Sequence, residues 1–390
     1  MLLSLLLLAA GCTEQYALQT TSFEDALVVE ATITNELKKQ QIRITRTYKL
    51  EENGPQPESR AVVYITDESG KQYDFEENDG IYLSADAFAA ETGKLYQLHI
   101  STQNGKSYTS STETLTTVNN MQDVKASVKT VKGDRGVSIN AMSFDPANSS
   151  KYYRYEFEET YKVIAPKWDD ERAVLGAFDP GTGFSGVSVI PRTIQNQVCY
   201  STKKSEDIIQ TSTNDLSEDR VDFPVRFIST QNYIISYRYS ILVWQYVQNL
   251  AAYTFYKTLK NLSGSESILS SNQPGFFYGN LKSEDDPNER IVGFFEVSSV
   301  SSKRIYFNYE DLFPGEPLPP YFTECDVREF KYCFNQNVDP ECKGAALVSV
   351  VGSNSLVHYD SNISYFFMVP PPCGDCTSFS SNIKPAFWID

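Results

Sequence analysis

Residues 41–50 read QIRITRTYKL, and apolar and polar side chains alternate along them. The side chains expected on a buried face are Ile42, Ile44, Tyr48 and Leu50. Those expected to face solvent are Arg43, Thr45, Thr47 and Lys49, and Arg46 alone breaks the alternation. A repeat of two residues is that of a β-strand, whose successive side chains point to opposite faces of a sheet. This stretch therefore predicts a half-buried strand.

Similar short strands are expected on both sides of this stretch. The pattern predicts them at residues 26–34, 61–66, 80–84 and 95–102. Asn104-Gly105 follows the last of these, and Asn-Gly is a strong signal for a tight hairpin turn. Strands at such regular intervals over about a hundred residues are typical of an immunoglobulin-like sandwich. We expect one over residues 23–118.

The next part of the chain, residues 119–311, predicts a larger β-rich domain with one helix. Strands are expected at residues 136–142, 152–163, 221–229, 233–244, 275–281, 291–300 and 304–309. A helix is expected near residues 246–262, because apolar side chains recur there at helical spacing and Gly264 follows as a C-terminal cap. Its apolar stripe would be Val247, Ala251, Phe255, Leu259 and Leu262.

The last part, residues 312–390, is rich in proline and cysteine and predicts irregular structure laid across the second domain. The fold class expected for the whole chain is mainly β. Aromatic residues make up 13% of the 390 residues and hydrophobic residues 41%, which indicates an ordered chain and favours strands. With 34 basic and 50 acidic residues the net charge is −16, so a nucleic-acid backbone would be repelled and is not an expected partner.

The first residues resemble a lipoprotein signal peptide. Residues 1–11 are leucine-rich and uncharged, too short to span a bilayer, and end in small residues directly before Cys12. This order resembles the lipobox of bacterial lipoproteins, in which the cysteine thiol receives acyl chains that anchor the protein to a membrane. Residues 12–22 would then be a lipidated tether. An ordinary secretory peptide is the alternative.

Six further cysteines lie at positions that suit an exported chain with disulfides. They are Cys199, Cys325, Cys333, Cys342, Cys373 and Cys376. Sequence cannot choose their pairing, although Cys199 lies so far upstream that complete pairing ties the tail to the central region. For Cys373-Gly374-Asp375-Cys376 a redox dithiol or half a zinc site is the alternative.

No catalytic set is evident in the sequence, and we expect neither an enzyme nor a cofactor. Gly181, Gly183 and Gly186 spell a dinucleotide-binding pattern but lack the strand and helix around it, so a flexible loop is expected there. His99 is expected on the polar face of a strand and His358 in a turn. A weak calcium site is conceivable at Glu284, Asp285 and Asp286, which lack the spacing of an EF-hand.

The end of the chain carries the most distinctive motifs, CGDCT at residues 373–377 and NIKPAFW at residues 382–388. Other stretches are LVVE at 27–30, YGN at 278–280, DDP at 285–287, IVGFF at 291–295 and SKRI at 302–305. Together they resemble a family of Bacteroidota lipoproteins catalogued as domain of unknown function 4249. The Lys-Pro step before Phe387 and Trp388 would place these two large side chains as an anchor of the terminus on a core.

This resemblance implies an outer-membrane or surface location and association with TonB-dependent transporters, but no known reaction. We therefore expect a non-enzymatic accessory lipoprotein of the cell envelope, anchored through Cys12, that docks on an outer-membrane β-barrel and helps to capture or gate cargo. The alternatives are a stand-alone surface module that binds a glycan or peptide, and an envelope hydrolase. Which face of the outer membrane the protein occupies stays open.

Overall fold

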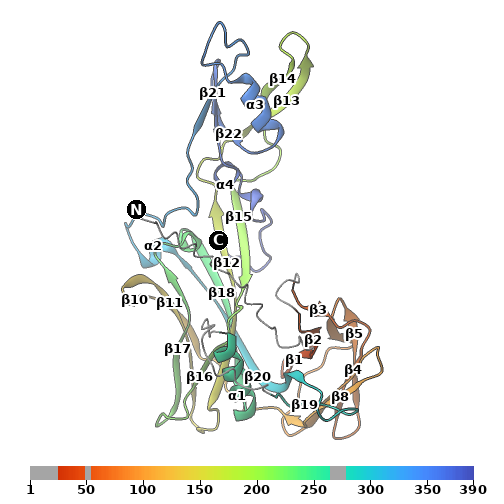
Figure 1. The fold of residues 1–390 in the computed structure, drawn as a ribbon. Coiled ribbons are helices and arrows are strands. Elements are labelled where there is room, and N and C mark those ends of the chain that lie inside the picture. The colour runs from red at the N-terminus through yellow and green to blue at the C-terminus, as the bar shows by residue number, and fades with distance from the viewer. Residues whose placement is uncertain (1–24, 49–53, 264–277) are drawn as a thin grey trace, which may run out of the picture.

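The computed structural model describes residues 25–48, 54–263 and 278–390. The expected mainly β fold is confirmed, since strands make up 49% of the structure and helices 10%. Figure 1 shows β-rich parts side by side at one end of an elongated molecule and a narrower part projecting from them. We refer to the broad end as the body. The narrow end is the distal lobe, which comprises residues 171–191 and 328–369.

The strand expected at residues 41–50 is β2 (Gln41–Arg46), which pairs antiparallel with β1 (Leu27–Thr34). Its alternation is confirmed at Ile42 and Ile44, which are fully buried, whereas Arg43 is exposed. The prediction was wrong for Tyr48, which is 44% exposed because the strand ends before it. Lys49 and Leu50 lie outside the described residues.

The N-terminal part of the body contains the strands expected at residues 26–34, 61–66, 80–84 and 95–102, with further short strands between them. The expected Asn104-Gly105 hairpin turn is present, and Gly105 adopts a φ of +86° there. The remaining strands are β3 (Gln56–Pro57), β4 (Val62–Asp67), β5 (Gln72–Asn78), β6 (Ile81–Ser84), β7 (Leu95–Ser101), β8 (Ser107–Ser110), β9 (Glu113–Thr114) and β19 (Leu281–Ser283).

One long strand, β20 (Ile291–Asn308), links the two halves of the body. The sequence predicted two strands here, but the chain runs through without a break. β20 lies parallel to β1 along its first half and antiparallel to β18 along its second half. Its residue Phe295 therefore belongs to the N-terminal core, whereas Phe307 belongs to the core of the second half. The N-terminal core is thus completed by residues far downstream in sequence.

The second half of the body is two sheets packed face to face. The sheet β10-β11-β17 lies against β12, β18 and the end of β20, and Ile139 and Ile241 share the buried cluster between them. The elements are β10 (Asp123–Val131), β11 (Asp134–Asp145), β12 (Tyr152–Ile164), β15 (Val198–Lys204), β16 (Ile209–Ser212), β17 (Asp219–Ser229), η1 (Tyr233–Ile235), β18 (Arg238–Gln248) and α2 (Tyr309–Leu312).

The helix expected near residues 246–262 is α1 (Leu250–Ser263), which begins later than predicted. β18 continues to Gln248, so Val247 is a buried strand residue and not part of the helical stripe. Ala251 is exposed and Ala252 buried, because the helix starts only after the Asn249 side chain caps it by accepting from the Ala252 N–H at 2.8 Å. The expected cap at Gly264 lies outside the described residues.

A buried charged cluster lies where α1 covers the sheet. The Arg154 guanidinium lies over the rings of Tyr246 and Tyr256, at 4.3 and 5.0 Å from their centroids, and 3.5 Å from Glu296. Burial, the largest single influence, lowers the pKa of Arg154, but Glu296, Glu156 and the two tyrosines together outweigh burial and the pKa is raised. Arg154 therefore stays charged, and its contact with Tyr256 fixes α1 on the sheet.

The distal lobe is more regular than the sequence predicted. We expected irregular structure after residue 312, but residues 328–369 form an antiparallel sheet and a helix, because residues 171–191 supply the rest of their apolar core. The elements are β13 (Glu171–Asp179), β14 (Phe184–Pro191), β21 (Arg328–Lys331), α3 (Gly344–Gly352), β22 (Val357–Ser361) and β23 (Tyr365–Val369). Below them lie α4 (Pro371–Gly374) and η2 (Cys376–Ser378).

Candidate interaction surface

The most exposed apolar feature of the distal lobe is the two-stranded ribbon β13–β14. Its strands pair only with each other among the described residues, so each has a free edge. Residues 173–178 (AVLGAF) and 184–191 (FSGVSVIP) carry no charge. Leu175 is 43% and Phe178 63% exposed. Natural proteins usually protect free edges with charges, and large exposed apolar patches mark interaction sites.

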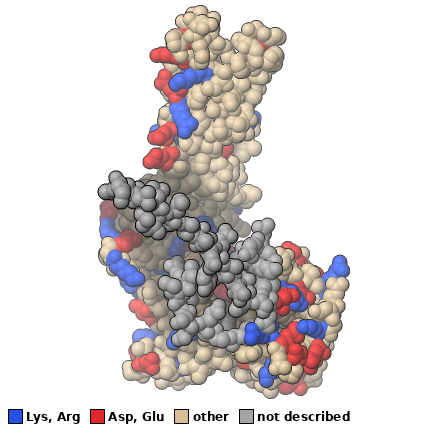
Figure 2. All heavy atoms as spheres, viewed as in Figure 1, with Lys and Arg blue, Asp and Glu red and all other residues tan. Residues whose placement is uncertain are grey.

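Further exposed apolar side chains lie elsewhere on the distal lobe. Val338, in the segment after β21, is 79% exposed, and Ile363, in the turn between β22 and β23, is fully exposed. Figure 2 shows that the charged residues visible on the lobe lie mainly along one side, while most of the visible surface is uncharged. We define the lobe surface as the exposed apolar side chains Leu175, Phe178, Phe184, Ile190, Val338 and Ile363.

The ribbon is fixed to the rest of the lobe by specific contacts. The Val187 N–H donates to the Tyr332 hydroxyl at 2.9 Å. The ring of Phe184 stacks on Phe334 with 5.4 Å between centroids. Such contacts reduce the entropy lost when a partner binds, because the surface is already ordered.

Two of the three glycines expected in a loop lie in one, and the third lies in a strand. Gly181 and Gly183 lie in the turn that joins β13 to β14, where Gly183 has a φ of +77° and its N–H donates to the Asp179 carbonyl at 2.8 Å. Gly186 lies within β14, which the sequence did not predict. Phe178 and Phe184 flank a Pro- and Gly-containing turn, and two apolar runs on either side of such a turn are the signal by which the ribbon could have been found.

A narrow neck joins the distal lobe to the body. It consists of residues 165–170 and 192–197 together with the segment around Cys373 (Figure 1). The Lys167 N–H donates to the Cys373 carbonyl at 2.8 Å. Arg192 donates from Nε to two backbone carbonyls of the opposite segment, at 2.9 and 3.0 Å. The neck is therefore cross-linked by hydrogen bonds.

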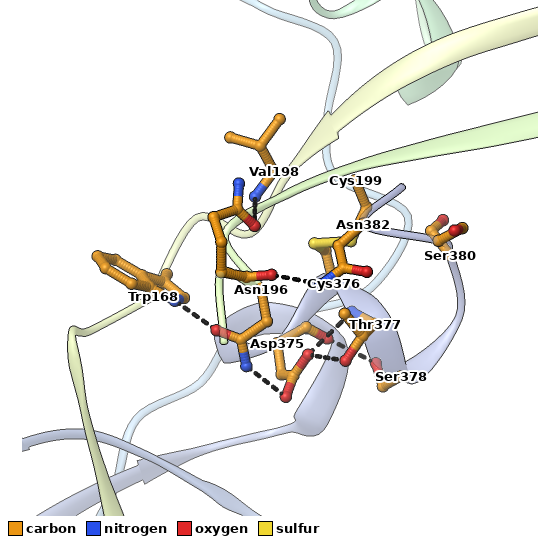
Figure 3. Close-up of a disulfide and its surroundings, with 12 residues drawn as sticks. Trp168, Asn196, Val198, Cys199, Asp375, Cys376, Thr377, Ser378, Ser380 and Asn382 are labelled. Carbon is orange, nitrogen blue, oxygen red and sulfur yellow. Dashed lines mark hydrogen bonds between the residues drawn. A yellow bond between two sulfur atoms is a disulfide. The ribbon is translucent and has the colours of Figure 1, made fainter. Parts of the chain in front are cut away.

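The expected disulfides are present, and one of them staples the neck to the body. Cys199 bonds to Cys376 across 177 residues of sequence. Figure 3 shows the polar contacts beside it, in which the Asn196 side chain accepts from the Trp168 indole at 2.7 Å and donates to Asp375 at 2.6 Å. The bridge that ties the tail to the central region is thus surrounded by a fixed hydrogen-bond network.

The other two disulfides are Cys325–Cys373, at the base of the distal lobe, and Cys333–Cys342, within it. Cys373 and Cys376 bond to different partners, so the alternative of a redox dithiol between them is wrong. The zinc alternative is also wrong, since a cysteine in a disulfide offers no thiolate to a metal.

Potential metal ligands gather at one place among the described residues, where Cys333, Asp339 and Cys342 meet. The two cysteines are bonded to each other, which leaves Asp339 as the only available ligand of this group.

The calcium candidates lie elsewhere, in the loop after β19. There Asp285 accepts from the Ser107 N–H at 2.8 Å, Asp286 from the Asn288 N–H at 2.9 Å, and Glu284 from Thr109. Their oxygens serve separate local contacts.

The two histidines lie far apart in the fold. His99 is on β7, as expected, with its ring stacked on Tyr64 at 4.7 Å. His358 was predicted in a turn, but it lies in β22 and is only 2% exposed, because β22 is covered by the neck. Its Nδ1 is 3.6 Å from Asp169, and burial lowers the pKa of His358 despite that carboxylate.

The C-terminal aromatics contact the second half of the body. Trp388 is buried, with its ring edge-on to Tyr200 and Tyr306 at 5.0 and 6.4 Å between centroids. Phe387 lies under the Arg304 guanidinium at 3.7 Å. The tail is therefore packed across the sheet β15-β12-β18-β20, whose outer strand β15 also carries Cys199.

Cys12 and the residues before it lie outside the described residues, so their placement is not seen. Among the residues that are described, no helix has the length and apolarity needed to cross a membrane.

Comparison with known proteins gives one family. A search of curated proteins found no match. The model of the domain of unknown function DUF4249 matches residues 13–304, which include β13, β14 and the neck. The match stops before β21, α3, β22 and β23, so the distal lobe is made partly from matched and partly from unmatched sequence. Because the match covers well over half of the chain, this protein belongs to the DUF4249 family.

Proposed function

We propose that this protein is a non-enzymatic accessory lipoprotein of the cell envelope that docks through its distal lobe onto an outer-membrane β-barrel. The observation that carries the proposal is the β13–β14 ribbon, which is uncharged over residues 173–178 and 184–191, pairs with no other described strand and has Phe178 63% exposed. An ordered apolar surface at the end of a narrow neck is typical of a site that binds another protein.

The disulfides support the proposed location in the cell envelope. The base of the lobe is held by Cys325–Cys373 and the neck by Cys199–Cys376. Disulfides persist outside the cytoplasm, which agrees with the expected lipid anchor at Cys12 and the envelope location implied by the resemblance. A β-barrel of the TonB-dependent transporter type is the partner that we propose, with capture or gating of cargo as the shared task.

Photo-crosslinking in intact cells tests the docking. A photoreactive amino acid replaces Phe178 in the full, anchored chain, and crosslinked partners are identified by mass spectrometry. The matched control carries the same amino acid at Leu37, an exposed apolar residue of the body that is 77% exposed. We expect an outer-membrane β-barrel protein to crosslink from Phe178 and not from Leu37.

A second variant shows whether the apolar surface matters. Phe178→Asp should abolish co-purification of the same β-barrel protein, whereas Leu37→Asp should leave it intact. A lone monomer in both the native chain and the Leu37→Asp control, with no crosslink from Phe178, would contradict the proposal.

A further inference from the structure

A cavity of about 360 Å³ lies in the second half of the body, where β12 and β18 meet the start of α2. This volume is within the range of small-molecule sites in proteins. Its lining comes from segments that are distant in sequence and that the tertiary structure brings together. The residues that matter for its chemistry are Lys162, Ser236, Tyr237, Arg238, Tyr309 and Leu318, with two carboxylates beside them.

Two cations face this cavity without a carboxylate partner. Among the described residues, Lys162 forms neither an ion pair nor a hydrogen bond, and Arg238 forms no ion pair. Arg238 donates from Nη1 to Asn308 at 3.1 Å, while its Nε is buried and has no acceptor in the described structure. A buried donor without an acceptor is costly, so the Arg238 Nε, beside a half-buried Lys162 that forms no ion pair, indicates that an acceptor is supplied from outside.

The two carboxylates of the lining are engaged elsewhere. Glu310 accepts from the Gly315 N–H at 3.0 Å, and Asp390 binds Lys384 at 2.5 Å. The Lys384 contact lowers the pKa of Asp390, and the field of Lys162 adds to this only as a smaller effect. Each carboxylate therefore has a partner within the chain, whereas the Arg238 Nε has no acceptor among the described residues.

Neutral groups complete the site. The Tyr237 hydroxyl has no hydrogen-bond partner in the part of the chain that the structure describes, and burial raises the pKa of Tyr237. It therefore remains a protonated donor at neutral pH. Tyr309, whose hydroxyl donates to the Pro317 carbonyl at 3.0 Å, offers its ring, and Leu318 adds an aliphatic wall.

We propose that this cavity binds a small organic anion, with its carboxylate or phosphate group held by Lys162 and Arg238 and its apolar body against Tyr309 and Leu318. The inference stands apart from the proposed docking function, because none of these residues belongs to the lobe surface. One anionic group on the ligand can contact both Lys162 and Arg238. A ligand body the size of an aromatic ring fits the volume of the cavity.

Calorimetric titration of the full chain with four probes tests the site. Phenyl phosphate and benzoate carry the two anionic groups, benzyl alcohol is their neutral analogue and benzylamine their cationic one. We expect at least one anion to bind, more weakly as salt is added, and at least about tenfold more tightly than the other two probes. Comparison of phenyl phosphate with benzoate distinguishes a phosphate from a carboxylate ligand.

Variants assign the binding to the cavity. Lys162→Gln should weaken anion binding at least about tenfold and Lys162→Arg should largely retain it, since a cation is preserved. Lys129→Gln is the matched control, because this lysine lies exposed on β10, outside the lining. Arg238 also stacks on Tyr306, so Arg238→Gln changes packing as well as charge. Its effect on binding is therefore compared with that of Lys162→Gln. Absence of binding by both anions, preference for benzylamine, or equal binding by Lys162→Gln and Lys129→Gln would each overturn the proposal.

Discussion

The body and the distal lobe are stabilised in different ways. The body buries two large apolar clusters and, beneath α1, charged residues such as Arg154 and Glu296 that are paired away from water. The lobe has a small cluster around Leu347 and Phe366 and relies on disulfides at its base and inside it. A small core contributes little stability, so covalent bonds supply what burial cannot. The comparison shows that the lobe can expose apolar residues because it does not depend on burying them.

The largest expected loss of stability comes from a substitution in the buried charged cluster of the body. Glu296→Ala removes the buried one of the two carboxylates that pair with Arg154 and leaves only Glu156, whose side chain is 44% exposed. The buried cation is then only partly compensated, which should lower the free energy of unfolding by about 3 kcal/mol. Denaturant titration of the full chain measures it. The double variant Arg154→Met with Glu296→Leu should cost much less, because no unpaired charge remains. Equal losses in the single and double variants would show that packing and not charge is responsible.

The second effect tests the lobe. Replacing Cys325 and Cys373 by serine should lower the stability of the lobe by about 2–5 kcal/mol while the body keeps its unfolding transition. Limited proteolysis with mass spectrometry should then find new cleavage in residues 165–170 or 192–197. Cleavage that instead begins in the body would mean that the two regions unfold together and that the contrast drawn above is wrong.

A smaller effect comes from pH. His358 is buried in β22, and burial holds its folded pKa below the ordinary histidine value of 6.5, so the unfolded chain binds the proton more readily. The stability that neutral His358 supports is fully present above pH 6.5 and is lost as pH falls below that value towards the folded pKa. The protection of β22 amides from hydrogen exchange, measured relative to the intrinsic exchange rate at each pH, should therefore fall below about pH 6.5 in the native chain.

The control for the pH effect is His358→Leu, which removes the titrating group at similar volume. Exchange of β22 in this variant should respond less to acid than in the native chain. Since Asp169 and Arg192 also face this histidine, a response unchanged by the substitution would assign the acid sensitivity to them instead.

The smallest expected effect is that of substitutions in the lobe surface on the free energy of unfolding. Phe178→Asp and Val338→Ser change exposed side chains, so each should alter the free energy of unfolding by no more than about 0.5 kcal/mol. Thermal unfolding of the full chain measures this. A loss of several kcal/mol would show that these residues belong to the lobe core, and the interaction surface would have to be redrawn.

Local pattern predicted the elements whose neighbours are close in sequence. The alternation through Ile42 and Ile44 and the Asn104-Gly105 turn were predicted correctly, because each depends on residues within one hairpin. The start of α1 was misplaced, because Val247 has a helical spacing to Phe255 but pairs with Ser299 of β20 as a strand residue. A register set by a distant strand cannot be read from local spacing.

Some features of the candidate sites were predictable from the sequence, and others required the fold. The six cysteines and their bonding in an exported chain were expected from their number and position, but the pairing of Cys199 with Cys376 required the fold. The ribbon β13–β14 was not recognised, because its apolar residues become exposed only through the way the lobe is built. The cavity at Lys162 and Arg238 was missed for the same reason, since its walls come from separate strands.

By itself the sequence determined that this is a β-rich chain with strands of alternating pattern, disulfides near its end and an acidic charge. These properties follow from composition and from neighbours along the chain. The tertiary structure alone decided that β20 completes two cores, that residues 171–191 and 328–369 build one lobe, and which cations remain without partners. Pairing between residues more than a hundred positions apart is set by which surfaces exclude water together, and that depends on the whole fold.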